Sequence, residues 1–246
     1  MTLTDELLAL AHGDERAVLF TVIDGDRELG RRVLVLLDRG EMIGDDPLGL
    51  EPLAVEQRRN GVIEHEGLRI FAEVFGPAPR LVVVGAVDTG EALCAAARRV
   101  GWRTICVDAR AQYATAERMP SADEIVVDWP EPAFARIVPD RDTAVVVLTH
   151  DDKFDIPALA VALRSDAFYV GALGSRRAQS MRRERLLEAG VTEAQLERLR
   201  GPAGLDIGAE SPAETAISIL AEALALRAGR LGGALREAPG RIHVER

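Results

Sequence analysis

Two arginines at the expected start of a helix are the side chains of this chain best suited to bind an anion. The segment 174–177, GSRR, follows the apolar run AFYV, and Ser175 is a residue type that caps helices. Gly174 allows close backbone approach. The helix dipole favours acidic residues in the first turn, so the positive charges of Arg176 and Arg177 are unfavourable there. A phosphate bound between them would account for two arginines at this position. Alternatively, both point into solvent or pair with neighbouring carboxylates.

A histidine follows another buried strand. His150 comes after AVVVL and Thr149, and Asp151 follows it directly. An imidazole oriented by a carboxylate can act as a general base, but a loop residue capping the next helix is an equal reading. Asp206, within GLDIG, is expected to orient backbone beneath a pocket rather than to do chemistry. We therefore assign no catalytic residue and keep His150 as a weak candidate.

These loops need a scaffold, and LVVVGAVDTGEALCAAARRVGWRTICVD predicts its first part. An apolar run at 81–84 predicts a buried strand, 91–99 a helix, and 104–107 a second strand. Such a strand–helix–strand unit is typical of dinucleotide-binding folds. The sequence therefore predicts a Rossmann-like α/β fold.

The phosphate-binding turn of this unit is altered. Gly85 suits the tight strand-to-helix turn, Gly90 lets the helix lie close to the sheet, and Asp108 stands where an acid meets ribose hydroxyls. Val87 occupies the position where bare backbone approaches a pyrophosphate, and a β-branched residue resists positive φ. Asp88, with an acid three residues later, has the spacing of a capping box and would repel an anion. We therefore expect NAD(P) to bind no better than about millimolar.

Downstream, strand and helix patterns alternate, as a doubly wound parallel sheet requires. Because ligands bind beyond the carboxyl ends of such strands, the loops described above should meet there. Strands are expected at 124–127, 144–148 and 167–170, and helices at 157–164, 176–188, 193–200 and 212–227.

A stiff linker at 75–79, FGPAP, separates this region from a smaller one. Upstream, a helix capped by Thr4 and strands at 17–23, 33–37, 62–63 and 68–75 predict a small α+β domain. We expect this domain at 1–76, a Rossmann-like domain at 80–228 and a tail at 229–246. A domain so small has few residues with which to cover both faces of its strands, which favours a homodimer.

Composition excludes several classes of protein. The 246 residues carry a formal charge of −10, which disfavours nucleic acid and anionic membranes as partners. The sequence has no apolar run long enough to span a bilayer and an acidic, amphipathic start, so we expect a cytoplasmic protein. Cys94 and Cys106 resemble buried core thiols. HExxH, CxxC and GxSxG motifs do not occur, so no metal site is expected.

Several distinctive segments lie within residues 80–227: DARAQYATAERMPSADEIVVDWP, THDDKFDIPAL, YVGALGSRR and the stretch RERLLEAG…LALR. Together they resemble the XdhC/CoxI family of accessory proteins for xanthine and carbon monoxide dehydrogenases, and the resemblance spans about 80–227. It implies a factor that binds the molybdenum cofactor, molybdopterin, aids its sulfuration and delivers it to a molybdenum hydroxylase of the xanthine dehydrogenase type. It also implies that the phosphate of molybdopterin, or of its nucleotide form, would meet Arg176 and Arg177, and that the protein is a dimer.

The N-terminal region departs from that family. Members usually carry a Ser-Ser-Pro stretch and an SGGCVE-type motif, whereas IDGDRELGRRVLVLLDRGEMIGDDPLG has neither, and no cysteine precedes Cys94. If the usual cysteine holds molybdenum or sulfur, this chain cannot do so alone, which points to a divergent paralogue that works beside a fuller one.

Three functions compete on these grounds. The first is a maturation factor that is not a stand-alone enzyme. The second is an NAD(P)-dependent oxidoreductase, with Asp108 on the ribose and His150 as acid/base. The third is a nucleotide-sensing regulatory module. Val87 and Asp88 count against the second. The candidate cofactor-binding residues are Gly85, Asp88, Gly90, Asp108, Thr149, His150, Asp151, Gly174, Ser175, Arg176, Arg177 and Asp206.

Overall fold

The structure is a computed structural model that describes residues 3–57 and 59–237. The chain divides into two compact units, Met1–Pro77 with Gly233–Arg246, and Ala78–Gly232. Within the described ranges, no helix is both long and apolar enough to cross a membrane. Of the tail expected from residue 229, the structure describes residues up to 237, including the 3-10 helix η1 (Leu235–Glu237).

The larger unit is built on a six-stranded parallel sheet with the order β11-β10-β9-β6-β7-β8. Its central strands are almost continuously apolar because both of their faces are covered. The sequence prediction of a Rossmann-like α/β fold is confirmed. The strands are β6 (Arg80–Val84), β7 (Arg103–Val107), β8 (Glu124–Val126), β9 (Thr143–Val147), β10 (Tyr169–Ala172) and β11 (Leu199–Arg200).

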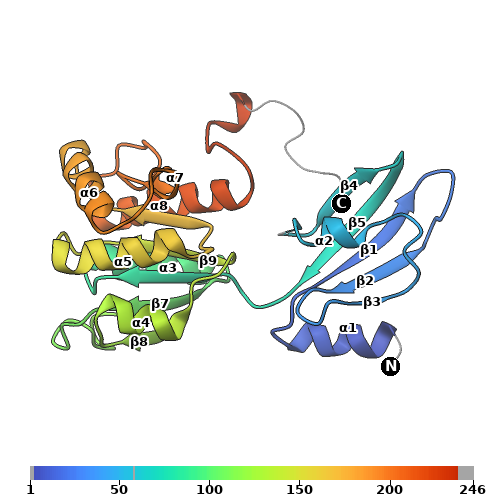
Figure 1. Ribbon diagram of the computed structural model, residues 1–246, viewed down its shortest axis with the longest axis horizontal. Coiled ribbons are helices and arrows are strands. Elements are labelled where there is room, and N and C mark those ends of the chain that lie inside the picture. The colour runs from blue at the N-terminus through green and yellow to red at the C-terminus, as the bar shows by residue number, and fades with distance from the viewer. Residues whose placement is uncertain (1–2, 58, 238–246) are drawn as a thin grey trace. The chain divides into compact units, whose positions relative to one another are not determined.

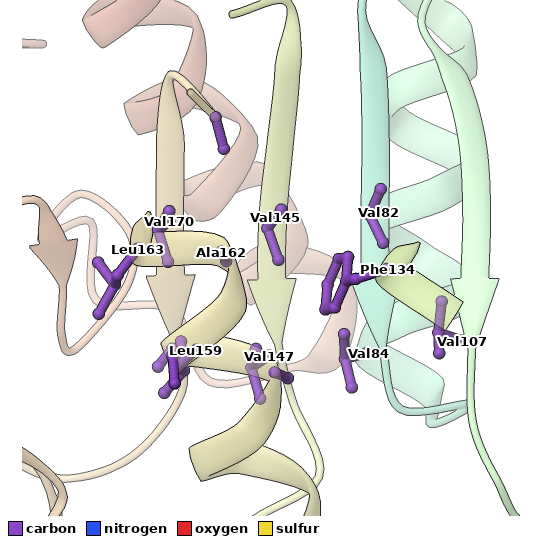
Figure 2. Packing of buried hydrophobic residues seen from close by; sticks show 14 of the residues in the cluster. Val82, Val84, Val107, Phe134, Val145, Val147, Leu159, Ala162, Leu163 and Val170 are labelled. Atoms are coloured by element: carbon purple, nitrogen blue, oxygen red, sulfur yellow. The ribbon is translucent and has the colours of Figure 1, made fainter. Parts of the chain in front are cut away.

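Helices cover both faces of this sheet, which gives three layers (Figure 1). On one face α4 and α5 pack on alternate strand residues; Figure 2 shows Phe134 and Leu159 among the strand valines. On the other face α3 and α8 cover the residues between, such as Val83 and Val146. The helices are α3 (Asp88–Arg99), α4 (Pro130–Ile137), α5 (Asp152–Arg164), α6 (Arg176–Glu188), α7 (Glu193–Leu196) and α8 (Pro212–Arg227).

The order of the strands reverses between β6 and β9. Strand β6 pairs with β7, which follows it in the chain, and also with β9 on its other side. In doubly wound sheets this switch point opens a crevice beyond the carboxyl ends of the two strands. The loops after β6 and β9 are therefore the first place to look for a site.

Some predicted elements of this unit were wrong. Helix α5 begins at Asp152 instead of 157, because the Asp151 side chain accepts the Lys153 N–H as N-cap and Pro157 is tolerated inside the helix. The helix expected at 193–200 stops at Leu196, and the following residues form β11 beside β10. Helix α4 was not predicted. Its first turn carries the two prolines of WPEP, which were not read as a helix start.

The smaller unit is a five-stranded antiparallel sheet with the order β3-β2-β1-β5-β4. Leucines of α1 cover one face, and residues of α2 and the preceding loop cover the other. The expectation that this unit has too few residues to cover both faces of its strands is therefore wrong. Helix α1 also includes Thr4, which is not its cap. The elements are α1 (Leu3–His12), β1 (Ala17–Asp24), β2 (Arg32–Leu36), β3 (Glu41–Ile43), α2 (Glu51–Ala54), β4 (Gly61–His65) and β5 (Leu68–Phe75).

Candidate functional site

The loops on either side of the switch point touch. Gly85 has φ +116°, and a Cβ built there would lie 2.8 Å from Cγ2 of Thr149. The backbone N–H of Leu148 donates to the carbonyl of Val84 at 2.9 Å. Gly85 is thus required both by its backbone conformation and by the close approach of the Thr149 loop.

Gly90 lets α3 lie against the sheet, as the sequence predicts. A Cβ on Gly90 would lie 2.8 Å from the carbonyl oxygen of Gly85 and 3.1 Å from Cγ1 of Val83. A larger residue would therefore push the helix away from the turn.

The start of α3 differs from the prediction. Val87, not Asp88, is the N-cap, with φ −120° and ψ 165°, and no side chain caps the helix. The Asp88 side chain is 86% exposed, 3.8 Å from Arg118, and the Glu91 carboxylate accepts the Ser121 N–H at 3.1 Å. The predicted capping box is thus wrong. Val87 has an extended backbone, so the positive φ that a β-branched residue resists is not required of it here.

Asp108 is held by protein donors. One carboxylate oxygen accepts the Ala86 N–H at 2.9 Å and Nη2 of Arg110 at 2.7 Å; the other accepts the backbone N–H and Nε of Arg110, both at 2.9 Å. Burial opposes ionisation of Asp108, but these donors outweigh it and hold its pKa below the usual range. A ribose would have to displace Arg110, and the Ala86 N–H is no longer available to a phosphate.

A buried ion pair connects the loops after β9 and β10, and the sequence did not predict it. Asp155 of α5 accepts from the Thr149 hydroxyl and from Nη2 of Arg182 at 2.9 Å. The Arg182 and Asp155 side chains are 5% and 2% exposed. Nη1 of Arg182 donates to the Leu173 carbonyl at 3.0 Å, and so links α6 to the end of β10. The apolar pattern of the sequence predicts that this helix begins at residue 157. That prediction places Asp155 in a loop, so the sequence provides no reason to pair it with an arginine of another helix.

His150 stands exposed in this loop with φ +59°, an uncommon conformation for a residue other than glycine. The Asp151 carboxylate accepts the Lys153 N–H at 3.0 Å, and the described structure records no hydrogen bond between it and His150. The structure thus shows the helix-capping role for Asp151 and no carboxylate-oriented base.

The start of α6 has the features expected of an anion site. Gly174 has φ +133°, and the Ser175 hydroxyl accepts the Ala178 N–H at 3.2 Å as the predicted N-cap. The first turn contains no acidic residue, and Arg177 is exposed. Arg176 opens the helix, and its side chain lies outside the described part of the structure.

The segment GLDIG is held in place by hydrogen bonds, but Asp206 does not make them. The Ala203 N–H donates to the carbonyl of Ala172 at 3.0 Å, which places the segment beside the end of β10. Glu222 of α8 accepts the Gly204 N–H at 2.8 Å and the Tyr169 hydroxyl at 2.6 Å. Burial raises the pKa of Tyr169, and the hydrogen bond to Glu222 raises it further. The Asp206 side chain is exposed, so the orienting role predicted for it belongs to Glu222.

The two cysteines lie in the core rather than at this edge. Burial raises the pKa of both thiols, that of Cys106 to about 12, so neither is a thiolate near neutral pH. In the part of the chain that the structure describes, no three His, Cys, Asp or Glu side chains are grouped to hold a metal ion.

Comparison with known proteins identifies the relatives of this chain. It is 31% identical over 167 residues to the uncharacterized protein YqeB of Escherichia coli, and 31% identical over 158 residues to a probable xanthine dehydrogenase subunit of Bacillus subtilis. It is 38% identical over 96 residues to the molybdenum cofactor insertion chaperone PaoD of E. coli. These matches cover 68%, 64% and 39% of this chain, but only 30%, 46% and 30% of the relatives.

A crystal structure of a protein named as a xanthine dehydrogenase from Bacillus halodurans has the same fold. It superposes with a TM-score of 0.56 at 22% identity, covering 97% of this chain and 98% of that one. The model of the XdhC Rossmann domain matches residues 81–223, which include every loop of the candidate site. The chain therefore belongs to the XdhC family.

Proposed function

We propose that this chain is a maturation factor that binds the molybdenum cofactor, or a related nucleotide-like anion, and delivers it to a molybdoenzyme of the xanthine dehydrogenase type. The observation that carries the proposal is the XdhC match over the Rossmann-like unit, together with a relative named as a molybdenum cofactor insertion chaperone. The cofactor is cargo in this role, so the chain needs residues that bind it and release it, not residues that transform it.

The first turn of α6 is the proposed place for the phosphate of that cargo. Helix N-termini bind anions through free N–H groups and the helix dipole, and this one lacks the acidic residues that would compete. Gly174 gives open access to the backbone, and Arg177 adds a positive charge. Arg182 and Asp155 hold the preceding loop from below. The turn is therefore positioned by the core while its outer surface is free to bind.

The smaller unit contributes no thiol to this work. No cysteine precedes Cys94 in the chain, and both cysteines are buried in the larger unit. Sulfuration of the cofactor would then depend on a thiol of another protein. We propose that this chain acts beside a partner that supplies it.

A nucleotide-sensing role is the second candidate, and one observation favours it. The start of α3 has no side-chain cap, so no capping side chain occupies the first N–H groups of that helix. An anion could approach the N–H groups of that helix. Bound adenine nucleotide without any pterin, in protein purified from cells, would support this role over the first.

The test of the proposal is to purify the full chain without oxygen from cells that make the cofactor, and to measure molybdenum and pterin per polypeptide. We expect both in stoichiometric amounts. The loaded chain should also activate a cofactor-free enzyme of the xanthine dehydrogenase type faster than free cofactor does. A chain that carries neither molybdenum nor pterin, and gives no activation, would contradict the proposal.

The oligomeric state is a separate expectation. The family resemblance implies a homodimer, although the covered faces of the smaller sheet no longer argue for one. Light scattering should give twice the chain mass of 26.6 kDa at micromolar concentrations. A mass that stays monomeric over that range would reject the dimer.

A further inference from the structure

An aromatic group stands at the carboxyl edge of the larger sheet. The ring of Trp129, three residues after β8, stacks on the ring of Phe154 in the first turn of α5, with centroids 4.6 Å apart and planes 11° apart. The chain has only two Trp, two Tyr and six Phe residues, and Tyr113 lies in the same group. This edge thus holds three of ten aromatic side chains.

Arg110 joins the group as a fixed cation. Its guanidinium carbon lies 4.6 Å from the ring centre of Tyr113 and 5.7 Å from that of Phe154. Asp108 holds the guanidinium through Nε and Nη2. The guanidinium is therefore anchored beside the aromatic stack, with its charge balanced by Asp108, and does not have to be ordered when a ligand arrives.

Trp129 is presented to solvent in a fixed position. It is 47% exposed, whereas Phe154 beneath it is 8% exposed. One face of the indole lies on Phe154, so the exposed part is the opposite face and the edge. The backbone N–H of Trp129 donates to Oδ1 of Asp128 at 2.8 Å, and its backbone carbonyl accepts the Ala133 N–H at 3.1 Å at the start of α4, so the backbone that carries the ring is held in place. The ring loses little freedom when a second ring covers it.

We infer that Trp129 is the platform of a binding site for a planar fused-ring heterocycle, a pterin or a purine. Such rings stack on an exposed indole whatever their substituents. This inference rests on the proposed function, because the ring that we expect to bind is the pterin of the molybdenum cofactor. An aliphatic or purely anionic ligand would make no use of the stack.

The platform is connected to the proposed phosphate site. Phe154 and Asp155 are neighbours in the first turn of α5. Phe154 supports Trp129, and Asp155 binds Arg182 of α6. A ligand with a flat ring and a phosphate would thus use two features that one helical turn holds in place.

The two tryptophans give a direct test, because Trp102 is 4% exposed. We would label the full chain with ¹⁵N-tryptophan and titrate it with pterin and, separately, with adenosine, following the two indole N–H signals. The Trp129 signal should move with saturation and the Trp102 signal should not. Tighter binding of pterin would identify the cofactor ring as the source, and tighter binding of adenosine a nucleotide.

The variant Trp129→Ala should weaken binding of the preferred ring by about tenfold or more, and Trp129→Phe should weaken it less. The matched control is Val127→Ala, since Val127 is 50% exposed two residues away but has no ring. Melting curves should show that all variants fold.

Two outcomes separate this inference from the proposed function. If neither ring moves the Trp129 signal at millimolar concentrations, or if Trp129→Ala binds the whole molybdenum cofactor as tightly as the native chain, the platform is rejected and the maturation role stands. If the native chain fails to bind the cofactor while pterin or adenosine still moves the Trp129 signal, the maturation role is rejected and the platform stands.

Discussion

Two helices begin at the carboxyl edge of the same sheet, and they are prepared differently for an anion. At α3 the first turn contains Asp88 and Glu91, and Asp108 takes the Ala86 N–H of the preceding turn. At α6 the first turn contains no acid and begins with two arginines. In a dinucleotide-binding Rossmann fold the first of these helices holds the pyrophosphate. Here the sequence places the more favourable electrostatics at the second.

The loop between β10 and α6 is also the better anchored of the two. Arg182 binds the carbonyl of Leu173 in this loop, and both Arg182 and its partner Asp155 are buried. The turn before α3 is bound by Asp108, which is also buried, but its partner Arg110 is partly exposed. Buried charges cost free energy unless they are paired. Keeping such a pair beneath α6 is consistent with a loop whose position matters.

Among the substitutions that test this comparison, removing the Arg182 side chain should have the largest effect on stability. Arg182→Ala leaves Asp155 buried without its partner, and we expect a loss of about 3–5 kcal/mol in the free energy of unfolding. The control Arg183→Ala breaks an exposed pair with Glu193 and should cost less than about 1 kcal/mol. Urea unfolding followed by tryptophan fluorescence reports on the larger unit, which contains both tryptophans. Equal losses in the two variants would show that the buried pair does not anchor the loop.

Removing the two arginines at the start of α6 should affect binding rather than stability. Arg176→Ala with Arg177→Ala should weaken cofactor binding by about 1.5–3 kcal/mol for each hydrogen bond to the phosphate that is removed. The free chain should be unchanged, or more stable by a few tenths of a kcal/mol, because two cations leave a helix N-terminus.

The control for that variant is Arg183→Ala with Arg185→Ala, on the same helix but paired with Glu193 and Asp152. It should melt slightly lower and bind the cofactor normally. Thermal melts with and without molybdopterin distinguish the cases. A double variant of Arg176 and Arg177 that melts lower yet keeps its ligand-induced shift would contradict the anion site.

The α3 side of the comparison predicts a dependence of stability on pH. The folded pKa of Asp108 lies below its unfolded value of about 3.9. The contribution of ionised Asp108 to the free energy of unfolding is therefore fully present above about pH 4–5. It is lost as the pH falls through the folded pKa. We expect Asp108→Asn to be less stable than the native chain by about 1.5–3 kcal/mol near neutral pH.

That difference should shrink as the pH falls below about 4, because the unfolded carboxyl group takes up its proton first and the native one only at a lower pH. Urea unfolding at several pH values measures it. A difference that stays constant down to pH 3 would mean that the ionised carboxylate does not stabilise the turn.

Local chemistry predicted much of the larger unit. The apolar runs at β6, β7 and β9 and the cap at Ser175 depend on residues close together in the sequence, and the structure has them all. Helix α4 and strand β11 were missed. The two residues of β11 are a strand only because they pair with β10, and no local pattern encodes that pairing.

The candidate site divides in the same way. Gly85 was identified because the tight turn requires glycine, and Gly90 because the helix must lie close to the sheet. The partners of Asp108 and Asp155 were not, although Arg110 is only two residues from Asp108. A carboxylate at the end of a strand looks the same in the sequence whether it faces a ribose or an arginine. Only the fold shows that these acids are occupied by protein donors.

The smallest expected effect concerns NAD at the altered turn of α3. Val87→Gly removes the side chain where the pyrophosphate would approach, yet we expect NAD affinity to rise only a few-fold and to stay near millimolar. The reason differs from the one that the sequence suggested. Val87 is extended at φ −120°, so glycine frees space without relieving backbone strain. Asp108 still holds the Ala86 N–H, and Arg110 still blocks the carboxylate from a ribose.

Calorimetry on the native chain, Val87→Gly and Val87→Gly with Arg110→Ala would separate these causes. The variant with both substitutions frees Asp108, so its affinity for NAD should rise more than that of Val87→Gly alone. Low-micromolar binding of NAD by the native chain would reverse the comparison, because the α3 turn would then be the working anion site and the oxidoreductase function would return.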